Sequence, residues 1–251
     1  MNNEKTVQTA MRAGRIILEA GGETYRVEDT MTRILTAYGM NDAQSFVTPT
    51  GIFLSCANSD GTQLNRLHRI RAISVDLEKI AMVNALSRRI DEEQLSVDQV
   101  DEALAAIIAR PMYPLWLNLL ASSLAALSFT LIFRGIPPEI LGSALAGPLV
   151  VLTRRTARGL NFNPFLQNAF GGLVAVLVGA ALRALGWTPT FSTMVIGTIM
   201  LLVPGITITN AIRDTFQGDY LSGVTRAMEA LVTASGIAFG TAMGFLLAGV
   251  I

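Results

Sequence analysis

The chain has 251 residues, of which 51% are hydrophobic and only 15% are charged, and its formal net charge at pH 7 is zero. Soluble domains carry about 25% charged residues, so part of this chain is expected in a membrane. The balanced charge gives no indication of nucleic acid as a partner. The single cysteine, Cys56, cannot form an intramolecular disulfide, which agrees with a reducing compartment. The first residues have no apolar run directly after their charges, so a signal peptide is not expected.

Residues 1–110 carry twelve of the 19 basic and fifteen of the 19 acidic residues. Apolar residues at helical spacing predict amphipathic helices over about 4–20 and 23–38, with Gly21-Gly22 between them. Polar and charged residues gather at the start of the second helix: Glu23, Tyr25, Arg26, Glu28 and Asp29. Acidic groups there are favoured by the helix dipole, so we interpret this cluster as a capped and solvated helix start.

From Ala43 the pattern becomes typical of β-structure. Strands are predicted over 43–48, 51–57 and 62–70, with a hairpin turn at Ser59-Asp60-Gly61.

Two further helices are predicted after the strands. Ser74 is expected to be the N-cap of a helix over about 75–90, and Ser96 that of a helix over about 97–109. Two helices, three strands and two helices in this order predict a compact α+β domain over residues 1–110.

Residues 111–251 have a different texture and predict an all-α bundle of five transmembrane helices. Each apolar run is close to the roughly 20 residues that span a bilayer, although the fourth is short. The runs lie at about 113–133, 136–152, 165–185, 190–204 and 226–251.

Small residues recur at every fourth position in the third and fifth of these runs. They are Gly171, Ala175 and Gly179 in the third, and Gly236, Gly240, Gly244 and Ala248 in the fifth. Helices in lipid associate through close backbone approach, so we interpret these residues as packing positions and not as ligands.

The arginines of this half indicate an orientation. Five lie in the segments after the second and fourth runs: Arg154, Arg155, Arg158, Arg213 and Arg226. The opposite connections hold only Arg134 and Arg183. By the positive-inside rule, the N-terminal domain is expected in the cytoplasm and the C-terminus outside.

Several enzyme classes lack their motifs in this sequence. There is no Walker A motif, no HExxH and no GxSxG, and Glu139 is the only acidic residue between Pro111 and Arg213. His68 is the only histidine, so no metal site is expected. We therefore predict no catalytic residues and no cofactor. A hydrolytic role for Glu23, Glu28 and Asp29 is the remaining enzyme alternative.

The charged stretch 204–230 is the best candidate for a solute site. Polar groups joined to hydrophobic helices usually line a cavity or a pathway. Pro204 is expected to interrupt a helix and to free backbone groups for a small polar solute. An arginine such as Arg213 suits a carboxylate, and an aspartate suits an ammonium group or a proton. The candidate substrate-binding residues are Pro204, Gly205, Thr207, Asn210, Arg213, Asp214, Asp219 and Arg226.

Simpler structural roles exist for the same residues. The stretch can be a cytoplasmic loop with positive-inside arginines. Arg226 and Glu229 are three residues apart on a helix and can pair with each other. Asp219 can cap the last helix.

The run PGITITNAIRDTFQGDYLSGVTRAMEA closely resembles the signature of the threonine/serine exporter family. Upstream, ILEAGGETYRVEDTMTRILTAYGM and RIRAISVDLEKIAMVNALSRRI are similar to the N-terminal half of that family. The family includes amino-acid exporters and a split branch of dicarboxylate (succinate) exporters. Since the sequence stops at Ile251, it resembles the larger subunit of the split, two-component form.

This resemblance implies a secondary exporter of a small carboxylate-bearing metabolite, most similar to threonine or serine, with a dicarboxylate as the alternative. The implied partners are the solute, membrane lipid, a smaller membrane subunit of four to five spans, and further copies of the chain. The implied location is the bacterial inner membrane, with multiple passes. Because no nucleotide-binding motif is present, the expected energy source is the proton motive force. A rival of another class is a sensor or scaffold domain on a membrane anchor, without transport.

Overall fold

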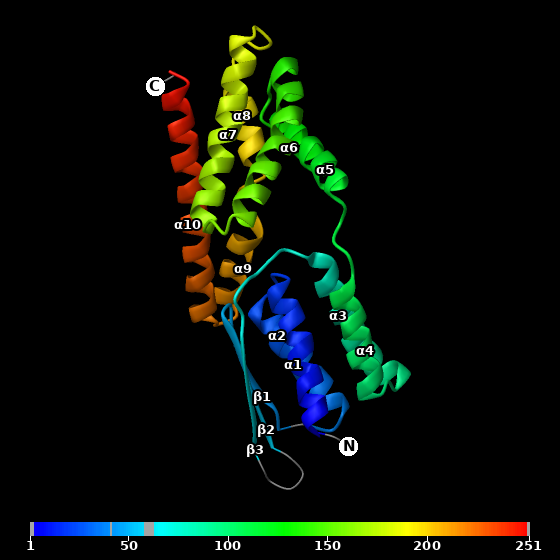
Figure 1. Ribbon diagram of the computed structural model, residues 1–251. Coiled ribbons are helices and arrows are strands. Elements are labelled where there is room, and N and C mark those ends of the chain that lie inside the picture. Colours follow the sequence, from blue (N-terminus) through cyan, green and yellow to red (C-terminus); the bar gives the residue numbers. More distant parts are fainter. Residues whose placement is uncertain (1–2, 41, 58–62, 250–251) are drawn as a thin grey trace. The chain divides into compact units, whose positions relative to one another are not determined.

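The computed structural model describes residues 3–40, 42–57 and 63–249. Within these ranges the chain forms ten α-helices and one three-stranded sheet (Figure 1). It divides into two compact units, Met1–Pro111 with Ile206–Ala227, and Met112–Gly205 with Met228–Ile251. The expected division after residue 110 differs from these units because residues 206–227 group with the N-terminal part. The turn predicted at Ser59-Asp60-Gly61 lies outside the described residues.

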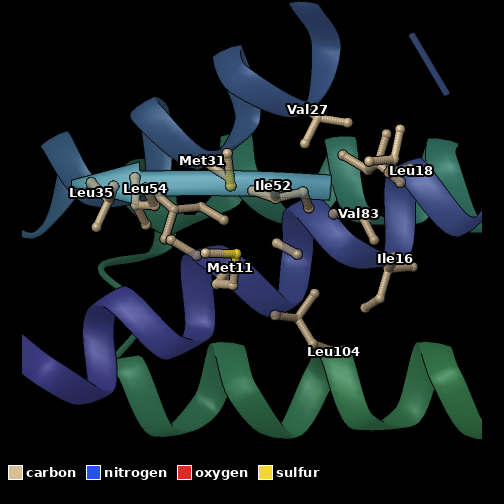
Figure 2. Packing of buried hydrophobic residues seen from close by; sticks show 14 of the residues in the cluster. Met11, Ile16, Leu18, Val27, Met31, Leu35, Ile52, Leu54, Val83 and Leu104 are labelled. Atoms are coloured by element: carbon tan, nitrogen blue, oxygen red, sulfur yellow. The ribbon is translucent and has the colours of Figure 1, made fainter. Parts of the chain in front are cut away.

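The first unit begins with two amphipathic helices, α1 (Asn3–Glu19) and α2 (Thr24–Ala37). Both were expected from their apolar stripes, and those stripes are buried. Gly14 lets the two helices approach closely, because a Cβ atom there would lie 2.6 Å from the sulfur of Met31. Figure 2 shows Met11 of α1 and Met31 of α2 among the buried hydrophobic residues that surround Ile52 and Leu54.

The sheet consists of β1 (Gln44–Thr48), β2 (Gly51–Ala57) and β3 (Gln63–Arg69), paired antiparallel in that order. Side chains alternate between its two faces, as the period of two requires. The face toward the helices buries Val47, Ile52, Leu54 and Cys56. The predicted strands are thereby confirmed.

Two further helices, α3 (Leu77–Glu93) and α4 (Val97–Ala109), follow the sheet in this unit. Its last part is the later segment Ile206–Ala227. Ser96 caps α4 in a capping box with Gln99, as predicted. The predicted cap of α3 is wrong, because Asp76 accepts from the backbone N–H of Lys79. The Ser74 hydroxyl donates instead to the carbonyl of Glu19.

The second unit is helical. It contains α5 (Leu115–Ile132), α6 (Pro137–Gly159), α7 (Pro164–Ala184), α8 (Ser192–Ile199) and the greater part of α10 (Tyr220–Leu247). The remaining helix is α9 (Gly205–Phe216). All of α9 except Gly205 belongs to the first unit, together with the start of α10.

Glycines bring α7 and α10 together. A Cβ atom on Gly240 would lie 1.8 Å from the carbonyl oxygen of Ala169, and one on Gly236 would lie 2.5 Å from that of Phe165. Gly244 similarly faces Val176. No side chain fits at these positions, so the interpretation of the glycines as packing positions is confirmed.

The prediction of an α+β domain followed by a bundle of five transmembrane helices is wrong. Among the described residues, three helices are long and apolar enough to cross a membrane, namely α5, α7 and α10. The fold is dominated by helices throughout, and the sheet is small.

Two of the expected spans fail for different physical reasons. The apolar run at 136–152 is only part of α6, which continues to Gly159 and includes Glu139 and three arginines. The run at 190–204 forms only the eight residues of α8, about 12 Å of helix against a hydrocarbon core of about 30 Å.

Candidate functional site

The site is built on the turn between α1 and α2. Gly21 adopts a positive φ of 84°, which side chains rarely tolerate, and turns the chain sharply after α1. The carbonyl groups of this turn face α9 and α10. Asn210 donates from its side-chain amide to the carbonyl of Gly21 at 2.9 Å, and Arg226 donates to that of Gly22 at 2.7 Å.

A buried ion pair joins α9 to α10. Oδ2 of Asp214 lies 2.9 Å from Nε of Arg226, and the side chains are 0% and 3% exposed. Among the described residues neither of these two atoms has a hydrogen-bond partner, so charge attraction holds them together. Buried charges are rare in proteins because desolvation is costly, and they require a partner. The pairing of Arg226 with Glu229, considered from the sequence, is replaced by this contact.

Thr24, the first residue of α2, is fully buried between two carboxylates. Its Oγ1 lies 3.1 Å from Oδ1 of Asp214 and 3.2 Å from Oδ2 of Asp219. Asp219 stands directly before α10, where a capping role was considered, but its side chain contacts Thr24.

Glu23 links two arginines. Its carboxylate accepts from Nε of Arg26 at 2.7 Å and also from Arg213. Burial alone would raise the pKa of Glu23, but the bonds from Arg26, its own backbone N–H and Arg213 lower this pKa below its ordinary value. The Arg213 side chain remains 44% exposed.

Glu28 has the opposite environment. Its Oε1 accepts from the backbone N–H of Val47 at 2.9 Å, and it has no ion pair among the described residues. Burial, together with the negative charge of Asp219, raises the pKa of Glu28 above its ordinary value. Burial also raises the pKa of Asp214, against the opposing effects of Arg226 and Thr24.

The structure brings five of the eight predicted site residues together in the first unit. They are Asn210, Arg213, Asp214, Asp219 and Arg226. Thr207 is half-buried, and no hydrogen bond joins it to the others among the described residues. Pro204 and Gly205 belong to the other unit. The interruption predicted at Pro204 is confirmed, because α8 ends at Ile199 and α9 begins at Gly205.

The N-terminal half of the site was missed from the sequence. Glu23 is 7% exposed, so the interpretation of its cluster as a solvated helix start is wrong for this residue. Thr24, which was not singled out from the sequence, is 0% exposed. Asp29, which pairs with Arg33, does lie at the surface. One signal was available: Thr24 stands three residues before Val27 and seven before Met31, on the buried stripe of α2.

The described residues contain no group of three or more side chains suited to hold a metal ion. The polar groups that meet at this site are paired charges, amide and hydroxyl groups, and backbone carbonyls.

Comparison with known proteins gives a consistent picture. Residues 8–248 match the model of the ThrE family, described as a threonine/serine exporter. The chain is 27% identical over 243 residues to a “Probable threonine/serine exporter” of Mycobacterium tuberculosis, covering 96% of this chain and 46% of that protein. It therefore spans about half the length of this relative.

The chain is also similar to shorter proteins. It is 24% identical to the “Probable succinate transporter subunit YjjP” of Klebsiella aerogenes, covering 86% of this chain and 84% of that protein. The subunit of the same name in Escherichia coli K12 is 23% identical, with 89% and 87% covered. No solved structure matches the chain.

Proposed function

Because this chain belongs to the threonine/serine exporter family, we propose that it exports a small carboxylate-bearing metabolite similar to threonine or serine. The family and the three apolar helices make it a membrane protein. We propose the bacterial inner membrane as its location, with the N-terminus in the cytoplasm and the C-terminus outside. The family is one of transporters, and we propose no catalytic activity.

The observation that carries the proposal is the arrangement of Arg213, Glu23 and Arg26. Arg213 is half-exposed and pairs with Glu23, which has a second arginine partner in Arg26. A solute carboxylate can therefore take the place of Glu23 on Arg213 while Glu23 stays paired. Exchange of one carboxylate for another avoids leaving a buried charge alone. The half-buried Asp219 is available for the ammonium group of an amino acid.

A dicarboxylate is the second candidate solute. The chain covers most of the relatives named succinate transporter subunits. Two carboxylates need two cations, and the side chains of Arg213 and Arg26 are 44% and 32% exposed. Replacing Arg26 by Gln should therefore weaken succinate export more than threonine export, because Arg26 keeps Glu23 paired in both cases but only a dicarboxylate also needs it as a second cation.

We propose a separate, smaller membrane protein as the functional partner, because the shorter relatives are named subunits. The Pro204 interruption, Gly205 and Thr207 are proposed to contribute backbone and hydroxyl groups along the solute path. Further copies of the chain and membrane lipid complete the proposed assembly.

The test is transport in proteoliposomes that contain this chain with and without the smaller subunit. Labelled threonine, serine and succinate are compared in the wild type, Arg213→Lys and Arg33→Lys. Lysine keeps the charge but loses the planar fork that binds a carboxylate at two points, so Arg213→Lys should lower export about tenfold or more. Arg33 pairs with the exposed Asp29, and its replacement should have no effect.

Co-reconstitution should be required for full transport. If none of the three solutes moves with either subunit composition, the transport proposal is overturned in favour of the sensor or scaffold alternative. If Arg213→Lys exports as well as the wild type, the solute carboxylate binds elsewhere.

A further inference from the structure

The Thr24 hydroxyl group makes two hydrogen-bond contacts but has only one hydrogen atom to donate. Its hydroxyl oxygen is within hydrogen-bond distance of both Asp214 and Asp219, at 3.1 and 3.2 Å. A hydroxyl group has a single proton and donates to one acceptor at a time. If both carboxylates were ionised, the second contact would join two oxygen atoms with no hydrogen between them. One proton on the pair gives each contact its hydrogen.

The surrounding charges lead to the same result. Four carboxylates lie around the start of α2: Glu23 directly before it, Glu28 within it, and Asp214 and Asp219, which both contact Thr24. The charge of Asp219 acts on both Glu28 and Asp214. Three arginines oppose the four carboxylates. Arg26 and Arg213 both pair with Glu23, and Arg226 pairs with Asp214.

Asp219 and Glu28 are left without a cation among the described residues, and the charge of Asp219 acts on Glu28. With all groups ionised, four negative charges meet three positive ones in a largely buried cluster. One added proton restores neutrality and removes the cost of burying an unpaired charge.

We propose that the Thr24-bridged pair of Asp214 and Asp219 binds one exchangeable proton, and that this proton is the one coupled to export. The second half of this inference rests on the proposed function. Arg226 holds one side of Asp214, so loss of the proton leaves Asp219 facing both Asp214 and Glu28 as ionised groups. The resulting repulsion separates the turn before α10 from the start of α2. Gly218, which has a φ of 92°, lies in that turn and permits a conformation that other residues rarely adopt.

Infrared spectroscopy of the purified chain tests whether the pair holds a proton, independently of transport. The wild type should show a carboxylic-acid carbonyl band at neutral pH that shifts in D₂O. Asp219→Asn and Asp214→Asn should each lose it, because neither leaves a carboxylate pair. Thr24→Val should shift the titration midpoint of this band, because it removes the hydroxyl group that contacts both carboxylates, and Thr24→Ser, which keeps the hydroxyl group, should restore the wild-type midpoint.

Two controls separate this site from its neighbours. Glu28→Gln should keep the band, with a midpoint at lower pH because a nearby negative charge is removed. Asp29→Asn, at the exposed pair with Arg33, should leave the spectrum unchanged. A band that survives in Asp219→Asn and disappears in Glu28→Gln would place the proton on Glu28 and overturn the inference.

Coupling is measured in proteoliposomes holding the chain and the smaller subunit, by recording the pH change that accompanies movement of labelled threonine, serine or succinate. We expect proton movement to accompany the solute. Solute transport without proton movement overturns the coupling while the proposed function stands. A proton band without transport of any of these solutes overturns the proposed function while proton binding by the pair stands.

Discussion

The guanidinium of Arg226 lies 2.9 Å from the carboxylate of Asp214 and also donates to the carbonyl of Gly22. These contacts tie α10 both to its neighbour α9 and to a turn 204 residues earlier in the sequence. Removing one member of a buried ion pair leaves the other charge without a partner, whereas removing both leaves none.

The ion pair predicts a non-additive pair of substitutions. Arg226→Met alone should lower the free energy of unfolding by about 3–5 kcal/mol, because Asp214 stays buried without its cation. The double variant Asp214→Leu with Arg226→Met should recover at least half of this loss. Thermal denaturation of the chain in detergent provides the measurement, with Arg33→Met as the exposed control. If the double variant is no more stable than Arg226→Met, the unpaired charge of Asp214 is not the cause of the destabilisation.

Glu23 and Glu28 should respond to pH in opposite ways. The lowered pKa of Glu23 contributes stability that is present above its unfolded value, near 4.5, and is lost as the pH falls through the folded value. The raised pKa of Glu28 gives a penalty instead. This penalty appears as the pH rises through the unfolded value and is complete above the folded one.

Glu23→Gln is therefore expected to lower the melting temperature at pH 7 and to have little effect at low pH. Glu28→Gln should raise the melting temperature at pH 7 and also have little effect at low pH. Melting curves of both variants from pH 2 to 8 test this. If both variants change the melting temperature in the same direction relative to the wild type, or by an amount that does not depend on pH, the two carboxylates do not have opposite pKa shifts.

The α7–α10 contact predicts that Gly240 cannot carry a side chain. Gly240→Ala should destabilise the protein by about 1–3 kcal/mol, because its Cβ atom would meet the carbonyl oxygen of Ala169 and the helices would have to separate. A Cβ atom on Gly159 would meet no atom of another segment within 4 Å, so Gly159→Ala is the matched control and should be neutral. Equal melting temperatures for both variants would contradict the close packing.

Membrane orientation can be tested by labelling with a thiol reagent that does not cross the membrane. Cys56 is unsuitable as the reporter because it is buried against the helices, and its protection would not depend on sidedness. The exposed position Gln63 serves instead, in a Cys56→Ala background. In intact cells Gln63→Cys should be protected, and a cysteine added after Ile251 should be labelled. Three crossings, like five, place the two ends on opposite sides. Labelling of Gln63→Cys from outside would reverse the proposed orientation.

Periodic burial explains what could be predicted from the sequence. The helices α1, α2 and α4 and the strand β2 each bury one face, so their apolar residues repeat with the period of the element. The strand β3 alternates between exposed and half-buried residues. The start of α3 was misplaced because Ser74 and Asp76 are both good caps, and the choice between them depends on the distant Glu19. Counting apolar runs gave too many membrane helices, because a run of apolar residues does not show where a helix such as α8 ends.

The site was predictable only on one side. Its C-terminal residues stand out as charges between apolar helices, and five of them do gather. Their partners Glu23 and Thr24 lie about 190 residues away, at a helix start whose composition also suits a solvated cap. Local sequence patterns do not show which distant segment supplies the partner of a buried charge. The contribution of Glu23 and Thr24 to the site could therefore be seen only in the structure.

The Gly21-Gly22 turn also has a consequence for biosynthesis. Its two carbonyl groups and the adjacent Thr24 receive their partners from residues 210–226, which the ribosome adds about 190 residues later. At roughly 5–20 residues per second, these partners follow Thr24 by about 10–40 s. By the end of that interval α5 to α8 have already been synthesised, and until then Thr24 lacks its contacts with Asp214 and Asp219, and Glu23 lacks its ion pair with Arg213. The N-terminal unit is thus completed only after most of the apolar helices have been delivered to the membrane.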